Sequence, residues 1–111
     1  MKFFNLILPF ILCINVSDAL IINEIMYNPE GDDEGHEWIE AYNDGMDPID
    51  IGNWIFDEAG TNHDLNAIIG NPVIEPGQYA IIADEWEIFL IDHAEFNGTL
   101  IDSSWSSLSN S

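Results

Sequence analysis

The sequence has almost no basic side chains and almost no cysteine. Among its 111 residues are 21 aspartates and glutamates but a single lysine or arginine, Lys2, which gives a formal net charge of −20 at pH 7. Nucleic-acid binding is therefore not expected, because no group of basic side chains is available to neutralise phosphates. Cys13 is the single cysteine, so no disulfide can form within the chain and the fold must depend on its apolar core.

The longest apolar run lies at the N-terminus and predicts a secretory signal peptide over residues 1–19. Lys2 supplies the positive charge at its start, residues 3–16 are almost entirely apolar, and Ser17 and Ala19 are the small residues of a cleavage site. The run is shorter than the roughly 20 apolar residues that a membrane span needs. We expect export, with only this segment meeting the membrane and one domain at residues 20–111. An uncleaved N-terminal anchor is the alternative.

The rest of the chain has the composition of one folded β domain. Hydrophobic residues make up 47% of the sequence and aromatic residues 12%, which is enough apolar material for a core. Glycine, proline, asparagine and aspartate divide it into short runs rich in isoleucine and aromatic residues. The runs are residues 20–27, 38–42, 49–51, 54–56, 73–74 and 79–83. Their length and spacing predict an all-β, antiparallel sandwich or barrel.

Two of these runs are predicted to be central strands. Side chains alternate between the two faces of a strand, so Trp38 and Tyr42 share one face while Ile39 and Ala41 share the other. Residues 79–83 are likewise apolar at every second position on both faces. Strands with two apolar faces are covered on both sides, so we expect both runs inside a sheet rather than at its edge.

A tight turn and one short helix are also predicted. Residues 75–78 read Glu-Pro-Gly-Gln, in which proline and glycine occupy the positions that a type II turn requires. After the strand that follows, Asp84 is placed to cap a helix over residues 85–90. Acidic residues in the first turn would favour this helix because they face the positive end of its dipole.

Four blocks of sequence resemble the lamin-tail domain of secreted bacterial and archaeal proteins. They are INEIMYNP at 22–29, GHEWIE at 35–40, IGNW at 51–54 and PGQY at 76–79, and the resemblance extends over residues 20–110. It implies an immunoglobulin-like antiparallel β-sandwich of about six or seven strands. It also implies an extracellular module, found beside nuclease or other hydrolase domains, with no catalytic activity of its own.

The family pattern continues beyond the serine-rich segment at residues 103–111 with further strands. Two interpretations follow. Either the sequence is truncated, or the sandwich lacks its final strands and keeps unpaired strand edges that invite pairing or aggregation. We favour truncation.

An acidic loop is the best candidate for a metal site. Asp32, Asp33 and Glu34 lie between Gly31 and Gly35, and clustered oxygen donors on a flexible loop suit Ca²⁺. The spacing is not that of an EF-hand. A solvated acidic loop without a bound ion is the alternative, and a salt-rich habitat would favour the same acidic surface. No other cofactor is expected.

No catalytic set can be assembled from the motifs present. His36, His63 and His93 are not spaced as zinc ligands, and no cysteine accompanies them. The serines are concentrated near the C-terminus, and no nucleophile-elbow motif is found. We therefore expect no enzymatic activity, although chance pairs of carboxylates are compatible with glycosidase chemistry.

These observations predict a binding or display module of a secreted or cell-surface protein. Its partner is expected to be a protein or another cell-surface component. Two alternatives stay open. The domain is stabilised by Ca²⁺ at the acidic loop, or it is the accessory fragment of an extracellular hydrolase such as a nuclease.

Overall fold

The computed structural model describes residues 2–4, 20–27, 31 and 34–105, and within them it is an all-β protein with one short helix. The elements are β1 (Lys2–Phe4), β2 (Leu20–Met26), β3 (Trp38–Asn43), β4 (Ile49–Asp50), β5 (Trp54–Glu58), β6 (Thr61–Asp64), β7 (Asn66–Ile69), β8 (Val73–Ile74), β9 (Tyr79–Ala83), α1 (Trp86–Asp92) and β10 (Thr99–Asp102). The predicted all-β class is confirmed. In the ranges described, no helix has the length and apolar character that a membrane crossing requires.

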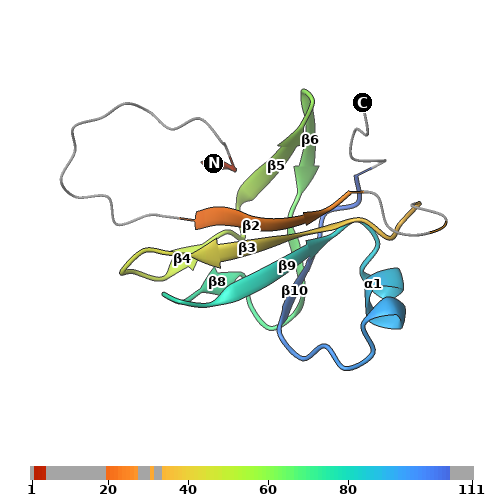
Figure 1. Cartoon of the computed structure of the whole chain (residues 1–111). Helices are drawn as coiled ribbons and strands as arrows, with labels where there is room; N and C mark the ends of the chain where they lie inside the picture. The colour runs from red at the N-terminus through yellow and green to blue at the C-terminus, as the bar shows by residue number, and fades with distance from the viewer. Residues whose placement is uncertain (1, 5–19, 28–30, 32–33, 106–111) are drawn as a thin grey trace.

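The strands form a large sheet and a second, smaller layer (Figure 1). The large sheet has five strands in the order β2-β3-β9-β10-β7, and the second layer contains the pairs β5-β6 and β4-β8. The backbone of β1, which lies within the predicted signal segment, runs parallel to β5. The two layers enclose the core, as expected of a sandwich.

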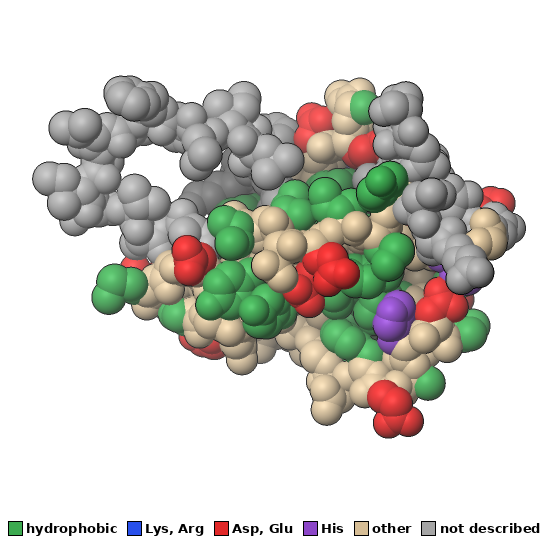
Figure 2. Space-filling view, viewed as in Figure 1, with side chains coloured by type: hydrophobic (Ala, Val, Ile, Leu, Met, Phe, Trp, Pro, Cys, Tyr) green, Lys and Arg blue, Asp and Glu red, His purple; other side chains and the backbone are tan. Residues whose placement is uncertain are grey.

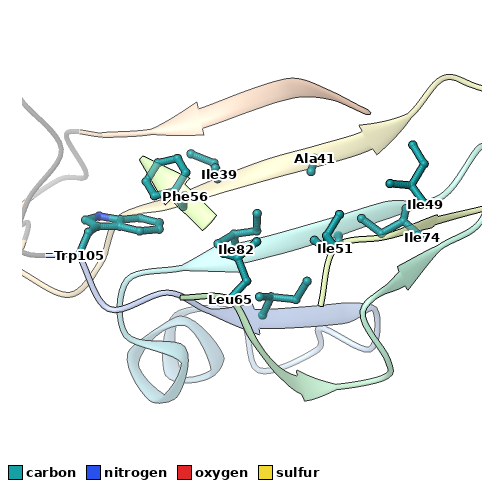
Figure 3. Close-up of a cluster of buried hydrophobic side chains, with 11 residues drawn as sticks. Ile39, Ala41, Ile49, Ile51, Phe56, Leu65, Ile74, Ile82 and Trp105 are labelled. Atoms are coloured by element: carbon teal, nitrogen blue, oxygen red, sulfur yellow. The ribbon is translucent and has the colours of Figure 1, made fainter. Parts of the chain in front are cut away.

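The main core lies between the two layers. Figure 3 shows Ile39 and Ile82 of the large sheet directed towards Ile51, Phe56 and Leu65 of the second layer. Ile39, Ile51 and Ile82 are 0–1% exposed. Each buried side chain of this size stabilises the fold by about 1.5–3 kcal/mol through its removal from water.

The two runs with apolar residues on both faces are interior strands, as predicted. β3 and β9 occupy the second and third positions of the large sheet. Their pairing is antiparallel, with Ala41 opposite Ala80 and Tyr42 opposite Tyr79. The predicted turn before β9 is also present, because Gly77 has φ of +79° and the Gln78 N–H donates to the carbonyl of Glu75 at 3.0 Å.

The strand pair β9-β10 is parallel, which departs from the antiparallel pattern expected for the whole sheet. A parallel pair needs a crossover of a dozen or more residues, and residues 84–98 with α1 provide it. The helix packs through Phe89, which is 3% exposed, against Ile81 and Leu100 on the outer face of the large sheet. The predicted helix is therefore confirmed, and it covers the sheet from outside.

Asn43, at the end of β3, ties the large sheet to the second layer. Its side chain is fully buried. Its Nδ2 donates to the carbonyls of Asp47 and Ile74, both at 2.8 Å, and its Oδ1 accepts from the Gly45 N–H at 2.9 Å. Ile74 belongs to β8, so a single amide fixes where the second layer meets the sheet.

We predict that Asn43→Ala destabilises the domain by about 2–4 kcal/mol, since it removes three hydrogen bonds and leaves buried carbonyls unpaired. Asn66→Ala, at an exposed position of β7, is the control and should change stability by less than about 0.5 kcal/mol. Urea unfolding followed by tryptophan fluorescence measures both. Equal effects from the two substitutions would show that the Asn43 network adds nothing to stability.

Candidate functional site

The predicted calcium loop lies mostly outside the described residues. Asp32 and Asp33 are not described, and Glu34 is exposed in the turn that leads towards β3. Within the described part of the chain, no three His, Cys, Asp or Glu side chains gather in a way that could hold a metal ion. The calcium site therefore stays a prediction.

The three histidines occupy separate local environments. The Nδ1 of His36 lies 2.5 Å from the Oδ2 of Asp92, at the end of α1. The ring of His93 stacks on Phe89 with centroids 4.4 Å apart, and His63 lies 3.8 Å from a Glu58 carboxylate oxygen. The three histidines therefore do not meet at a common site.

A cluster of buried polar groups closes one end of the large sheet. Glu37, Asp84 and Ser103 are 1%, 4% and 3% exposed, and Trp105 is 3% exposed. The indole Nε1 of Trp105 donates to Glu37 Oε2 at 3.0 Å. Backbone bonds align the same region, because Asp84 N–H donates to the Glu37 carbonyl at 3.1 Å. These residues end neighbouring strands, so the sheet register brings them together.

Asp84 does not cap α1, so that prediction was wrong. The N-cap residue is Glu85, and its side chain makes no capping hydrogen bond. The Asp84 carboxylate instead accepts a hydrogen bond from the Gly35 backbone. Asp84 directly follows β9, and the loop before β3 provides the backbone donor that its carboxylate uses.

The pKa of the Asp84 carboxyl is raised from 3.8 to about 6, and burial is the largest cause. The negative charges of Glu85, Glu37 and Asp102 contribute to the same rise, in that order, while the hydrogen bond from Gly35 opposes it. None of these causes is a positively charged side chain, so no cation offsets the repulsion between Asp84 and the neighbouring carboxylates. This agrees with the net charge of −20. The carboxyl is therefore held in its neutral form to a higher pH than an exposed aspartate.

The outer face of the large sheet, which points away from the second layer, is covered on one half only. Phe89 of α1 makes an edge-on contact with Trp38, with ring centroids 6.0 Å apart. Ile81, Ala83 and Leu100 complete this covered half. The other half, towards the start of β9, bears large apolar side chains that remain partly exposed.

A row of three side chains crosses this open half; we call it the tyrosine row (Ile21, Tyr42 and Tyr79). Ile21 on β2 lies opposite Tyr42 on β3, and Tyr42 lies opposite Tyr79 on β9. The two tyrosine rings are 4.6 Å apart and tilted by 32°. Ile21 is 43% exposed and Tyr79 51%. Exposed side chains of this kind supply contact area for a partner, because an aromatic ring buries much apolar surface with little loss of conformational freedom.

An acidic row lies next to the tyrosine row on the same outer face. Glu24 of β2 stands directly opposite Glu40 of β3. The Nδ2 of Asn23 donates to Glu40 Oε1 at 2.7 Å. Like charges at opposed positions repel, so the two carboxylates concentrate negative charge on this part of the face. In Figure 2, acidic side chains lie among apolar ones on the face in view.

A surface groove of about 530 Å³ adjoins Tyr79. Its walls are the turns at Gly70 and Gly77 and the segment from Asn97 to Thr99. The sequence alone predicted neither this groove nor the tyrosine row beside it. The alternation in β3 and β9 assigned each tyrosine to a face of its strand, but only the strand register brings the two rings together.

We predict that Asp84→Asn stabilises the domain increasingly as the pH rises from 4 to 7. In wild type the raised pKa of Asp84 contributes stability in full below about pH 3.8, and this is lost as the pH rises through about 6. Asparagine cannot ionise and still offers an acceptor to Gly35. Urea unfolding at fixed ionic strength, compared with the exposed control Asp44→Asn, measures the difference. If both variants differ from wild type equally at every pH, the burial of Asp84 has no consequence for stability.

Comparison with known proteins agrees with the resemblance seen in the sequence. The model of the family described as Lamin Tail Domain matches residues 15–110, most of the chain. No curated protein and no solved structure matches it. The match over nearly the full length, together with the observed sandwich, shows that this chain belongs to the lamin tail domain family.

Proposed function

We propose that this chain is a non-catalytic binding module that acts outside the cell, and that the tyrosine row contacts a protein partner. The observation that carries the proposal is the open half of the outer sheet face. There Ile21 and Tyr79 remain 43% and 51% exposed, while the helix covers the other half. Exposed apolar groups gathered on one face are typical of interaction sites.

The chemistry of the acidic side chains supports binding rather than catalysis. The buried acids Glu37 and Asp84 are held by Trp105 and the Gly35 backbone, at the closed end of the sandwich. A catalytic acid or base has to reach a reacting group on a substrate. The lamin tail domain family is a family of immunoglobulin-like, non-enzymatic domains, and this supports the same assignment.

The extracellular location rests on the predicted signal segment at residues 1–19. The composition is compatible with it, because a chain whose single cysteine lies inside that segment needs no particular redox environment. The strong negative charge keeps copies of the domain apart at moderate ionic strength. A module of this kind would act as a monomer that presents its binding surface to a different protein, rather than as a subunit of a homo-oligomer.

The test is capture of surface proteins from the producing cells by immobilised full-length chain, followed by chemical crosslinking. Tyr79→Ser should lower the amount captured by about tenfold or more, as expected for a central aromatic contact. Tyr27→Ser is the matched control, because Tyr27 is a tyrosine of equal exposure, 52% against 51%, that lies beyond the end of β2. The control should capture as much as wild type.

Two results would contradict this proposal. In one, wild type captures nothing above the level of the blank support. In the other, Tyr79→Ser and Tyr27→Ser reduce capture equally, which would indicate non-specific adhesion of exposed aromatic rings. Circular dichroism of both variants verifies that the sandwich is intact.

A further inference from the structure

Strand β2 is an edge of the large sheet and has an open side. It pairs with β3 over residues 20–26 and stands first in the strand order β2-β3-β9-β10-β7. Among the described residues, no strand pairs with its other side. Backbone N–H and C=O groups along such an edge are available to a further strand.

The side chains of β2 are exposed on both faces of the sheet. Ile21 points to the outer face and is 43% exposed, while Ile25, on the core side, is 48% exposed. Ile25 stands opposite Ile39, which is 1% exposed. The second layer thus covers Ile39 but leaves Ile25 exposed. A further strand beside β2 would bring side chains next to Ile25 and reduce this exposure.

The charged side chains near the open edge of β2 indicate which kind of strand would fit there. On the outer face Glu24 stands opposite Glu40, and the one lysine or arginine of the chain is Lys2. Tyr42 and Tyr79 lie in the adjacent row, with rings 4.6 Å apart. A lysine or arginine from an added strand would neutralise the glutamates and could rest on a tyrosine ring.

The charge also argues against a second copy of this chain at the same edge. Pairing two β2 edges would join two chains of net charge −20, each with Glu24 on its edge strand. Like charges directly opposed across strands are destabilising. The charges therefore favour a different, cationic chain as the occupant.

We propose that the open edge of β2 accepts an extended segment of a partner protein as an added strand of the sheet. The segment carries a lysine or arginine on its outer face beside Glu24, with a side chain long enough to extend towards Glu40, and apolar residues on its other face beside Ile25. The inference rests on the proposed binding function and specifies the partner. Main-chain hydrogen bonds supply affinity and the alternating side chains supply specificity, as in other cases of strand addition.

The test uses a seven-residue synthetic peptide with alternating arginine and valine, since β2 itself has seven residues. Full-length chain is titrated at an ionic strength of about 0.15 M, at which charges further apart than about 8 Å are screened. A second peptide of the same sequence has every backbone amide N-methylated, so it keeps its charge but has no backbone N–H group to donate to the edge of β2. We expect the first peptide to bind and to shift the amide resonances of β2, and the second to bind at least about tenfold more weakly.

Two variants locate the site. Glu24→Lys should weaken binding of the first peptide by about tenfold or more. Glu95→Lys, at an exposed position after α1, changes the net charge by the same amount and should weaken it by less than about threefold. Glu24→Gln gives an intermediate loss and covers the case in which the lysine variant fails to fold.

Equal binding of the two peptides, or equal effects of Glu24→Lys and Glu95→Lys, would overturn strand addition and leave only general attraction to an acidic surface. These outcomes are distinguishable from failure of the binding function. If the peptide does not bind but Tyr79→Ser still abolishes capture of surface proteins, only the edge proposal fails. If capture is also unaffected, both fail.

Discussion

The arrangement of the two layers depends on the hydrogen bonds of Asn43. Both N–H groups of its side-chain amide donate and its amide oxygen accepts, and its backbone bonds to Gln78 and Gly77 in the turn before β9. One residue therefore sets the strand register of the large sheet, the position of β8 and the path of the loop after β3. The tyrosine row depends on the same register, because Tyr42 directly precedes Asn43 and Tyr79 begins β9. The position of the tyrosine row on the outer face therefore depends on the buried side-chain amide of Asn43.

Negative charge is accommodated in two different ways in this domain. Most acids lie on the surface, where water and salt screen them. Glu37 and Asp84 are buried, and each is compensated by a neutral donor, the Trp105 indole or the Gly35 amide. Neutral donors stabilise a buried carboxylate less than a cation does. This end of the sandwich is therefore held together by packing and hydrogen bonds, and ionisation of Asp84, whose pKa is raised, weakens it.

The sequence predicted the parts of the fold whose side chains alternate strongly. The strand at Trp38, the strand after the Pro-Gly turn and the short helix are all present. Strands β6 and β7 could not be predicted, because β6 (Thr61–Asp64) carries no apolar side chain and β7 is exposed at three of its four positions. The capping role given to Asp84 was wrong, since local sequence does not reveal a donor from the distant Gly35. The tyrosine row required the register between strands, which one-dimensional patterns do not contain.

The parallel pair β9-β10 divides the large sheet into a local central unit and an outer edge. These two central strands are joined through α1 within residues 79–102, so a short segment encloses both Ile81 and Leu100 beneath Phe89. Closing a short loop costs little chain entropy, and contacts near in sequence form early. β2 lies two strands away and shares none of this local unit. The packing under the helix therefore does not depend on what pairs with β2, so a strand added at this edge would leave the centre of the sheet unchanged.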